Sequence, residues 1–259
     1  MILDGKTLIV SGVGTGLGSE IARLAIRDGA NVVLAARTAK TLEAVAAQVD
    51  PGGDRVASVP TDITDAEQCD ALARTAVERF GGVDAIAQVA ALSDTFGGLE
   101  EATREDWMRN HETNVVGSLQ VCRAAARQMK ARGGGSIVLI GSQSSFLPQV
   151  PQIAYASSKG ALRSAMFFMA KELGPDRIRV NTVVPTWMWG PPVEGFVNSQ
   201  ASQRGVSADE VIAEITAGMP LGEIPKDDDV AEAVVFLASE RARMITGQCL
   251  LVNAGELMT

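Results

Sequence analysis

A glycine-rich loop between a strand and a helix, near the amino terminus, most constrains how this chain can fold. The segment Thr7–Ser11 is aliphatic and β-branched, which is typical of a short buried strand. The glycines of Gly12-x-x-x-Gly16-x-Gly18 follow, and Glu20–Arg27 then has helical periodicity. Glycine permits a tight turn and lets a pyrophosphate approach the amides at a helix amino terminus. This context predicts a phosphate cradle, although the spacing differs from G-x-G-x-x-G.

Strand and helix patterns alternate along the rest of the chain. Strands are expected at Thr7–Ser11, Asn31–Ala36, Arg55–Pro60, Ala85–Val89, Ser136–Ile140, Arg179–Val184 and Cys249–Val252. Helices are expected near Gly16–Asp28, Ala39–Val49, Ala66–Phe80, Arg104–Ala131, Ala154–Leu173 and Asp228–Ser239. Such alternation implies right-handed crossovers and a doubly wound, Rossmann-like parallel sheet of about seven strands, with helices on both faces. We therefore predict an α/β fold in a single domain, residues 1–259. Residues 187–219 do not follow the alternation of strands and helices, and we expect them to form a substrate lid.

A tyrosine and a lysine four residues apart carry the chemical signal. On a helix, Tyr155 and Lys159 lie on one face, about one turn apart. A phenol has a pKa near 10 and is a poor acid or base at neutral pH. A neighbouring ammonium stabilises the phenolate and lowers that pKa, while the hydroxyl of Ser142 could hold a substrate oxygen. Tyr-x-x-x-Lys alone often occurs by chance. It indicates a catalytic site here because the glycine loop precedes it in the same chain.

Together these motifs resemble the short-chain dehydrogenase/reductase family, over the whole length of the chain. Ser142, Tyr155 and Lys159 match the catalytic serine, tyrosine and lysine of that family. Asn114, within Thr113-Asn114-Val115-Val116-Gly117, matches its catalytic asparagine, which holds a water in the proton relay. The resemblance implies an NAD(P)-dependent oxidoreductase that interconverts a secondary alcohol and a ketone. It also implies that Lys159 binds the nicotinamide ribose.

The same resemblance implies where a dinucleotide would bind. Gly12, Gly16 and Gly18 fall on the cofactor-loop glycines, and Asp62 falls on the acidic residue that contacts the adenine ring. The full set of implied cofactor-binding residues is Gly12, Thr15, Gly16, Leu17, Gly18, Arg37, Asp62, Ile63, Ala90, Tyr155, Lys159, Pro185 and Thr186.

Two stretches depart from the family pattern. Gln88-Val89-Ala90-Ala91 replaces the usual Asn-Asn-Ala-Gly, an element that acts largely through its backbone. Thr186 replaces the glycine after Pro185, and Gly190 lies where a threonine usually meets the nicotinamide amide. These departures leave open an alternative from another class, a dinucleotide-binding sensor or scaffold without turnover. Sugar-nucleotide epimerases and dehydratases also use Tyr-x-x-x-Lys but usually carry an extra carboxyl-terminal region, so they are the weaker alternative.

The choice of cofactor depends on the end of the strand Asn31–Ala36. An NAD-specific site would place an aspartate there to accept a hydrogen bond from the ribose 2′-hydroxyl, and Ala36 cannot do so. The guanidinium of Arg37 can instead pair with the 2′-phosphate of NADP. Against this, Thr15 occupies a loop position where NADP-preferring relatives often carry a second basic residue. We expect NADP(H) to be favoured over NAD(H), without strict exclusion.

Composition excludes several other classes of function. A net charge of −8 argues against nucleic acid as a partner, because proteins that bind it show a basic footprint. Cys69, Cys122 and Cys249 lack metal-ligand spacing, so no metal site is expected, and they suit a reducing compartment. The sequence shows no pattern of a signal peptide or membrane span, so we expect no membrane partner and a cytoplasmic location.

The lid predicts the character of the substrate. Trp187, Met188 and Trp189 are expected to line a pocket with Ser142, and no basic cluster nearby could hold a phosphate or carboxylate. We therefore predict a bulky, uncharged, hydrophobic alcohol or ketone. The family resemblance further implies a homotetramer, or failing that a dimer, built on the long helices and the last strand. The expected interface residues are Val121, Ala125, Met166, Phe167, Phe168 and Met169.

Overall fold

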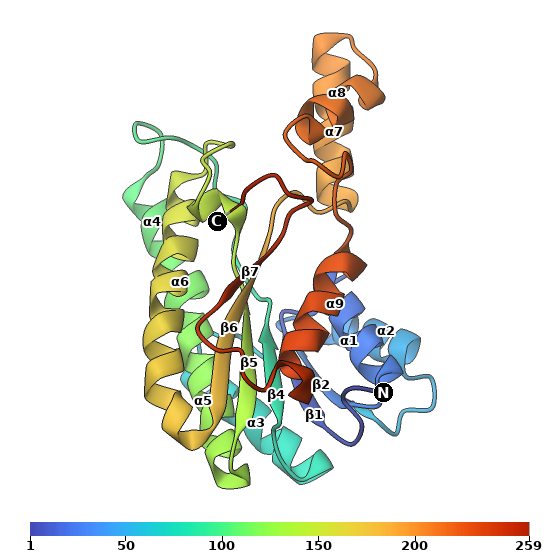
Figure 1. Cartoon of the computed structure of the whole chain (residues 1–259), viewed down its shortest axis with the longest axis vertical. Helices are drawn as coiled ribbons and strands as arrows, with labels where there is room; N and C mark the ends of the chain where they lie inside the picture. Colours follow the sequence, from blue (N-terminus) through green and yellow to red (C-terminus); the bar gives the residue numbers. More distant parts are fainter. Residues whose placement is uncertain (259) are drawn as a thin grey trace.

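The computed structural model, which describes residues 1–258, is built around a seven-stranded parallel sheet (Figure 1). The strand order is β3-β2-β1-β4-β5-β6-β7, and every neighbouring pair is parallel. This confirms the predicted α/β fold and doubly wound sheet, and each strand end lies within one residue of its expected position. The strands are β1 (Thr7–Ser11), β2 (Asn31–Ala36), β3 (Val56–Pro60), β4 (Ala85–Gln88), β5 (Gly135–Ile140), β6 (Ile178–Pro185) and β7 (Cys249–Val252).

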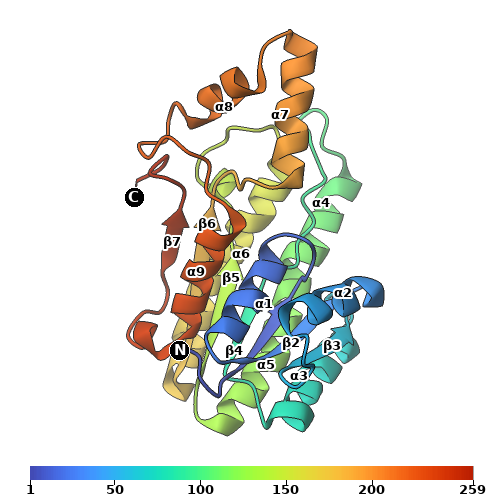
Figure 2. The same ribbon diagram turned by 90° about the vertical axis from the view of Figure 1, so that its right-hand side faces the viewer.

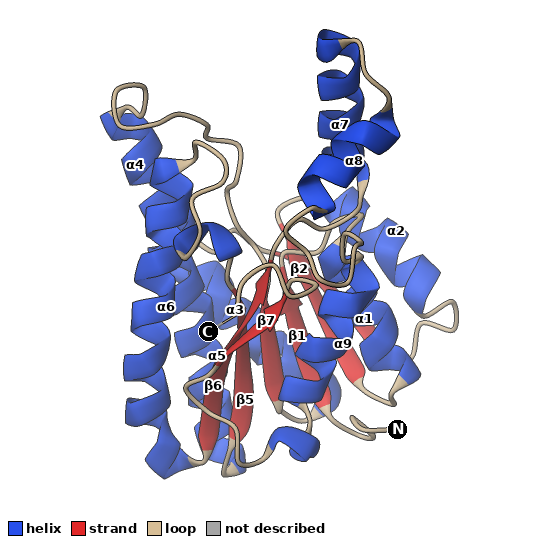
Figure 3. Ribbon diagram, turned by 45° about the horizontal axis from the view of Figure 1, so that its top comes forward, coloured by secondary structure: helices blue, strands red, loops and turns tan. Residues whose placement is uncertain are grey.

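Helices cover both faces of the sheet (Figure 3). One face carries α1 (Leu17–Arg27), α2 (Ala39–Val49) and α9 (Asp227–Ala238). The other carries α3 (Ala66–Phe80), α5 (Ser118–Arg132) and α6 (Ile153–Leu173). The crossovers therefore reverse direction between β1 and β4, and such a reversal opens a crevice at the carboxyl ends of the strands.

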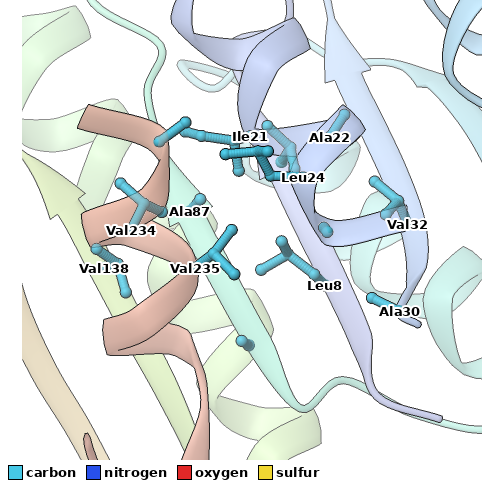
Figure 4. Close-up of a cluster of buried hydrophobic side chains, with 14 of the residues drawn as sticks. Leu8, Ile21, Ala22, Leu24, Ala30, Val32, Ala87, Val138, Val234 and Val235 are labelled. Carbon is cyan, nitrogen blue, oxygen red and sulfur yellow. The ribbon is translucent and has the colours of Figure 1, made fainter. Parts of the chain in front are cut away.

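A buried apolar layer joins each set of helices to the sheet. In the layer beneath α1 and α9, Leu24 and Val235 pack over Leu8 and Ala87 of the central strands (Figure 4). All four side chains are buried, and burying a leucine or valine fully contributes about 1.5–3 kcal/mol. Because the central strands are apolar on both faces, they hold the strand ends that carry the site in fixed positions.

The expected helix Arg104–Ala131 is not continuous. It consists of α4 (Arg104–His111), a π-helical turn (Glu112–Gly117) and α5. At Gly117 an added Cβ would lie 2.8 Å from Cγ1 of Ile63, so the helix presses closely on the loop after β3. Extra residues in a helical turn of this kind often occur at functional sites, and this one contains Asn114.

The predicted lid contains two helices that the sequence analysis did not foresee. Both α7 (Pro191–Arg204) and α8 (Ala208–Thr216) stand beyond the carboxyl edge of the sheet (Figure 2). Pro191 and Pro192 occupy the first turn of α7. Proline is favoured there because the first helical amides have no partner within the helix. In residues 1–258, no helix has the length and apolar character needed to span a bilayer.

Candidate active site

A cavity of about 580 Å³ opens at the carboxyl ends of the central strands. It is the place where the strand order reverses, and it brings together the glycine loop, the end of β2, the end of β5 and helix α6. Of the residues predicted from sequence, the cavity is lined by Gly12, Leu17, Arg37, Asp62, Ile63, Ala90, Ser142, Tyr155, Lys159, Pro185, Thr186 and Met188. Six predicted residues lie outside this lining: Thr15, Gly16, Gly18, Asn114, Trp187 and Trp189.

The glycine loop is packed so tightly that two of its positions accept only glycine. Gly12 has φ +97°, and an added Cβ there would lie 2.2 Å from the backbone nitrogen of Ala90. An added Cβ at Gly18 would lie 2.5 Å from the carbonyl oxygen of Gly12. Gly16 precedes α1, and its carbonyl accepts a hydrogen bond from the Ser19 hydroxyl at 2.7 Å. The loop therefore presents its backbone to the cavity, as a phosphate cradle requires.

One end of the cavity carries the residues expected to bind an adenosine. Arg37 is exposed and lines the cavity beside Asp62. The Asp62 carboxylate accepts hydrogen bonds from the Thr64 hydroxyl at 2.7 Å and the Thr64 backbone at 2.9 Å. These two bonds, with a smaller contribution from the Arg37 charge, hold the pKa of Asp62 below its usual range. Asp62 is thus a fixed acceptor, while Arg37 extends its charge toward solvent.

Tyr155 and Ser142 meet at the other end of the cavity. Tyr155 lies in the first turn of α6, and Ser142 follows β5. Burial raises the pKa of Tyr155, and a hydrogen bond with Ser142 acts in the opposite direction. The Ser142 hydroxyl also lies 2.8 Å from that of Ser144. A substrate oxygen placed beside Tyr155 would therefore find two hydroxyl groups already oriented by the protein.

Lys159 is almost completely buried one helical turn after Tyr155. Its Nζ donates a hydrogen bond to the carbonyl of Ile140 at 2.9 Å and lies 5.8 Å from the centre of the Tyr155 ring. Burial lowers the pKa of Lys159 to about 8. The sequence predicts that the ammonium lowers the pKa of Tyr155, whereas in the structure burial raises this pKa and the opposing contribution comes from the hydrogen bond with Ser142.

Asn114 is fully buried behind these groups. Its side-chain oxygen accepts from the Leu92 backbone nitrogen at 2.7 Å, and its nitrogen donates to the Leu92 carbonyl at 2.9 Å. The same nitrogen lies 3.0 Å from the hydroxyl of Ser158, the residue before Lys159. Asn114 thus ties the π-helical turn to both the cavity wall and α6, although only its neighbour Thr113 lines the cavity.

The first departure from the family pattern leaves the groove intact. The backbone nitrogens of Val89 and Ala90 donate to the Ser11 carbonyl at 2.8 and 2.9 Å. The buried Gln88 side chain donates to the Ser118 hydroxyl and to the Ala90 carbonyl, both at 3.0 Å. The strand end is therefore held through its backbone and by the amide of Gln88, which replaces one of the usual asparagines.

Three residues of the predicted lid were expected to form a pocket wall, and of these only Met188 lines the cavity. The Trp187 ring instead packs on Phe196 of α7, with ring centres 5.2 Å apart. Trp189 lies at the base of the lid, where its backbone nitrogen donates to the Pro225 carbonyl at 2.8 Å. The Trp187 ring thus packs within the predicted lid, and the backbone of Trp189 joins the base of the lid to the segment that follows it. A pocket wall formed by either tryptophan stays a prediction.

A polar cluster beside Ser142 was not predicted from the sequence. Gln143, which directly follows Ser142, contacts Thr186, Asn253 and Glu256. No local motif marks these residues, because they come from three distant parts of the chain. Among residues 1–258, no group of histidine, cysteine, aspartate and glutamate side chains is arranged to hold a metal ion.

The cavity suits a nicotinamide dinucleotide. The backbone of the glycine loop, the acceptor Asp62 and the buried Lys159 all border this one cavity, and these are the groups that would hold the phosphates, the adenosine and the nicotinamide ribose of such a molecule. Residues 12–256 match a family model described as enoyl-(acyl carrier protein) reductase.

Individual known proteins that are similar to this chain include two dehydrogenases and a reductase. The chain is 34% identical over 260 residues to L-rhamnose 1-dehydrogenase (NAD(P)⁺) of Azotobacter vinelandii, covering 98% of both chains. It is 32% identical over 255 residues to D-threitol dehydrogenase of Mycolicibacterium smegmatis, covering 98% of this chain and 93% of that one. Among solved structures, L-sorbose reductase from Gluconobacter frateurii, complexed with NADPH and L-sorbose, aligns with a TM-score of 0.92 and 27% identity over 100% of both chains.

Proposed function

This chain belongs to the short-chain dehydrogenase/reductase family, and from that premise we propose that it interconverts a secondary alcohol and a ketone with Tyr155 as acid and base. The observation that carries the proposal is the meeting of Tyr155, Ser142 and Lys159 in one cavity with the glycine loop. That the chain is an NAD(P)-dependent oxidoreductase follows from its relatives.

The mechanism follows from what each side chain can donate. A bound nicotinamide supplies the hydride in the reductive direction and accepts it in oxidation. Tyr155 donates its phenolic proton to the carbonyl oxygen, and Ser142 holds that oxygen by a hydrogen bond. Lys159 has three N–H groups, of which one bonds to Ile140, so it can also bind ribose hydroxyls and stabilise the phenolate. Asn114 holds the π-helical turn against α6 through Ser158, and the role that the family resemblance implies for it is to hold a water that connects Lys159 to solvent.

We further propose that NADP(H) is favoured over NAD(H). The support is the position of Arg37, which is exposed at the rim of the cavity beside Asp62 and the end of β2. A guanidinium there can pair with a 2′-phosphate, whereas Ala36 offers no acceptor to a 2′-hydroxyl. Thr15 is exposed and lies outside the lining, so it adds no second cation.

For the substrate, two candidates have support. The first is a small alcohol with several hydroxyl groups, because rhamnose, threitol and sorbose appear in the names of the relatives. Ser93, Ser142 and Thr186 line the cavity and could bind such hydroxyls. The second is the hydrophobic alcohol or ketone predicted from sequence, supported by Leu92 and Met188 in the same lining. We place the polyhydroxylated substrate first, since neither Trp187 nor Trp189 lines the cavity.

The proposal also covers the oligomeric state of the protein and its location in the cell. We propose a homotetramer, with exposed Phe167 and Phe168 on α6 as part of its interface. We also propose a cytoplasmic location, which the three free cysteine thiols support.

A paired substrate panel tests this function. Sugars and polyols are offered alongside steroid, terpenoid and alicyclic alcohols of matched concentration, each with NAD⁺ and NADP⁺, and reduced cofactor is followed by absorbance. We expect turnover of at least one secondary alcohol and none by Tyr155→Phe. Tight cofactor binding without oxidation of any compound would instead support a sensor or scaffold. A preference for the hydrophobic set would reverse our order of the two substrate candidates.

A further inference from the structure

The chain turns back sharply after β7 and brings a carboxylate to the active site. Ala254 has φ +52° and Gly255 has φ +86°, so two successive residues adopt left-handed backbone conformations. Alanine seldom adopts this conformation, because its Cβ then lies too close to the following carbonyl oxygen. Asn253 stabilises the turn by donating to the Leu257 carbonyl at 2.9 Å and accepting from the Gly255 nitrogen at 3.1 Å. Strain of this kind persists only where surrounding contacts maintain it.

Those contacts converge on the Glu256 carboxylate. One oxygen accepts from the Gln143 amide at 2.6 Å and from the Thr186 hydroxyl. The other accepts from the Gln149 amide. The Gln143 amide also donates to the Thr186 hydroxyl at 3.2 Å, and its oxygen accepts from Asn253 at 2.7 Å. Every polar atom of the buried Gln143 side chain is therefore bonded, and three of the hydrogen bonds in the cluster end on a charged group.

The cluster joins the segments that carry the catalytic residues. Gln143 directly follows Ser142, and Gln149 lies in the loop between Ser142 and helix α6, which carries Tyr155. Thr186 lines the cavity at the end of β6. Thr186 is also the residue that replaces the family's glycine, and its hydroxyl is bonded within this cluster. The substitution at this position therefore has a partner near the carboxyl terminus of the same chain.

We propose that Glu256 is a positioning residue that sets the place of Ser142 and the shape of the substrate end of the cavity. It acts through Gln143, Thr186 and Gln149 and does not touch the reacting atoms. The inference rests on the proposed function, since it assigns these contacts to the same secondary-alcohol site. The glycine loop, Arg37 and Asp62 belong to other strand ends, so Thr186 is the one expected cofactor contact that is bonded to Glu256.

Kinetics of Glu256→Ala and Glu256→Gln provide the first test. We expect Glu256→Ala to lower kcat/KM for the alcohol at least about tenfold, because charge-assisted hydrogen bonds are lost together. The dissociation constant of the cofactor, measured without alcohol, should change much less than kcat/KM, because Thr186 alone among the expected cofactor contacts is bonded to Glu256. Glu256→Gln keeps one acceptor oxygen and should recover part of the loss. The matched control is Glu223→Ala, which removes an exposed glutamate outside the cluster and should change neither quantity.

A double-mutant cycle with Thr186→Val tests the coupling directly. Valine keeps the shape of threonine but cannot donate to Glu256, so Glu256→Ala should have a smaller effect in that background. Additive effects of the two substitutions on kcat/KM would contradict the proposal.

Hydrogen exchange makes the inference testable separately from catalysis. In Glu256→Ala, backbone amides of residues 143–152 should exchange faster than in the wild type, while those of the glycine loop stay unchanged. If the wild type turns over no alcohol, the proposed function fails and the exchange result alone decides the role of Glu256. Unchanged exchange in residues 143–152, or an equal effect of Glu223→Ala, would overturn it.

Discussion

At the scale of single residues, the proposed chemistry depends on the proton of Tyr155. Tyr155→Phe keeps the ring and removes the transferable proton, so the fold should survive and kcat should fall by about 10²–10⁴-fold. Turnover measured with the best substrate of the panel checks this, with thermal unfolding as the control for folding. Retention of more than about a tenth of wild-type kcat would exclude Tyr155 as the acid and base.

Tyr155 is also the only tyrosine of the chain, so its titration can be observed directly. Burial raises its pKa from the ordinary value of 10.0, and Lys159, whose pKa is lowered to about 8, loses its charge before the phenol ionises. The tyrosinate absorbance band of the cofactor-free protein should therefore appear at a pH above 10, while the urea-unfolded chain titrates near 10. Circular dichroism at each pH verifies that the protein stays folded. A folded-state midpoint below 10 would mean that the lysine controls the phenol after all.

Arg37 determines the expected cofactor preference. Arg37→Ala should lower kcat/KM with NADPH about tenfold or more, because a charge-assisted hydrogen bond contributes about 1.5–3 kcal/mol. The value with NADH should change little, since that cofactor has no 2′-phosphate. Lys40→Ala, an exposed lysine in the first turn of α2, is the matched control for loss of positive charge. A wild type that prefers NADH would already refute this role for Arg37.

At the scale of elements, the strand–loop–helix unit of β1 and α1 is held by close backbone contacts. Gly12→Ala would place a Cβ 2.2 Å from the Ala90 nitrogen at φ +97°, so it should destabilise the protein by several kcal/mol, of the order of other special backbone positions. Gly14→Ala has no atom within 4 Å of its Cβ and should leave the free energy of unfolding almost unchanged. Urea unfolding of the two variants makes the comparison. Equal stabilities would mean that the loop can move away from Ala90.

The long helical segment shows what periodicity reveals and what it hides. The sequence predicted one helix from Arg104 to Ala131, and the structure has the π-helical turn Glu112–Gly117 within it. Apolar periodicity identifies the helix because it depends on neighbouring positions. The turn depends on contacts of Gly117 with Ile63 and of Asn114 with Leu92, which no local pattern contains.

At the scale of the whole molecule, the structure corrects the predicted interface. Val121, Ala125 and Met166 are buried in the core of their own subunit, because α5 and α6 turn these side chains toward the sheet, so they supply no surface for a partner. Phe167 and Phe168 of α6 are 50% and 75% exposed, which is unusual for adjacent phenylalanines unless another surface covers them.

Phe168→Glu should therefore weaken the assembly. A charge placed in an apolar interface is costly, so the variant should shift from tetramer to smaller species at micromolar concentration. Light scattering after size-exclusion chromatography measures the mass. Val77→Glu, on the outer side of α3, should leave the mass unchanged. A wild-type protein that is already monomeric would refute the proposed tetramer.

The sequence by itself determined the order of strands and helices along the chain and many of the residues that line the cavity, such as Gly12 and Tyr155. Strands, helices and glycine loops depend on neighbouring residues, and their side-chain patterns therefore specify them locally. Parallel connectivity then brings all the strand ends, with Gly12, Asp62, Ser142 and Pro185, to one edge of the sheet.

Only the tertiary structure decided which side chains outside the sequence motifs lie in or beside the cavity. Trp187 packs on Phe196 and not on the cavity, since the proline-started helix α7 places that ring beside it. Gln143 and Glu256 are 113 residues apart and meet because β5 and β7 lie on either side of β6. A contact of this kind depends on how the crossovers stack strands and loops together, and local sequence patterns carry no record of such long-range packing.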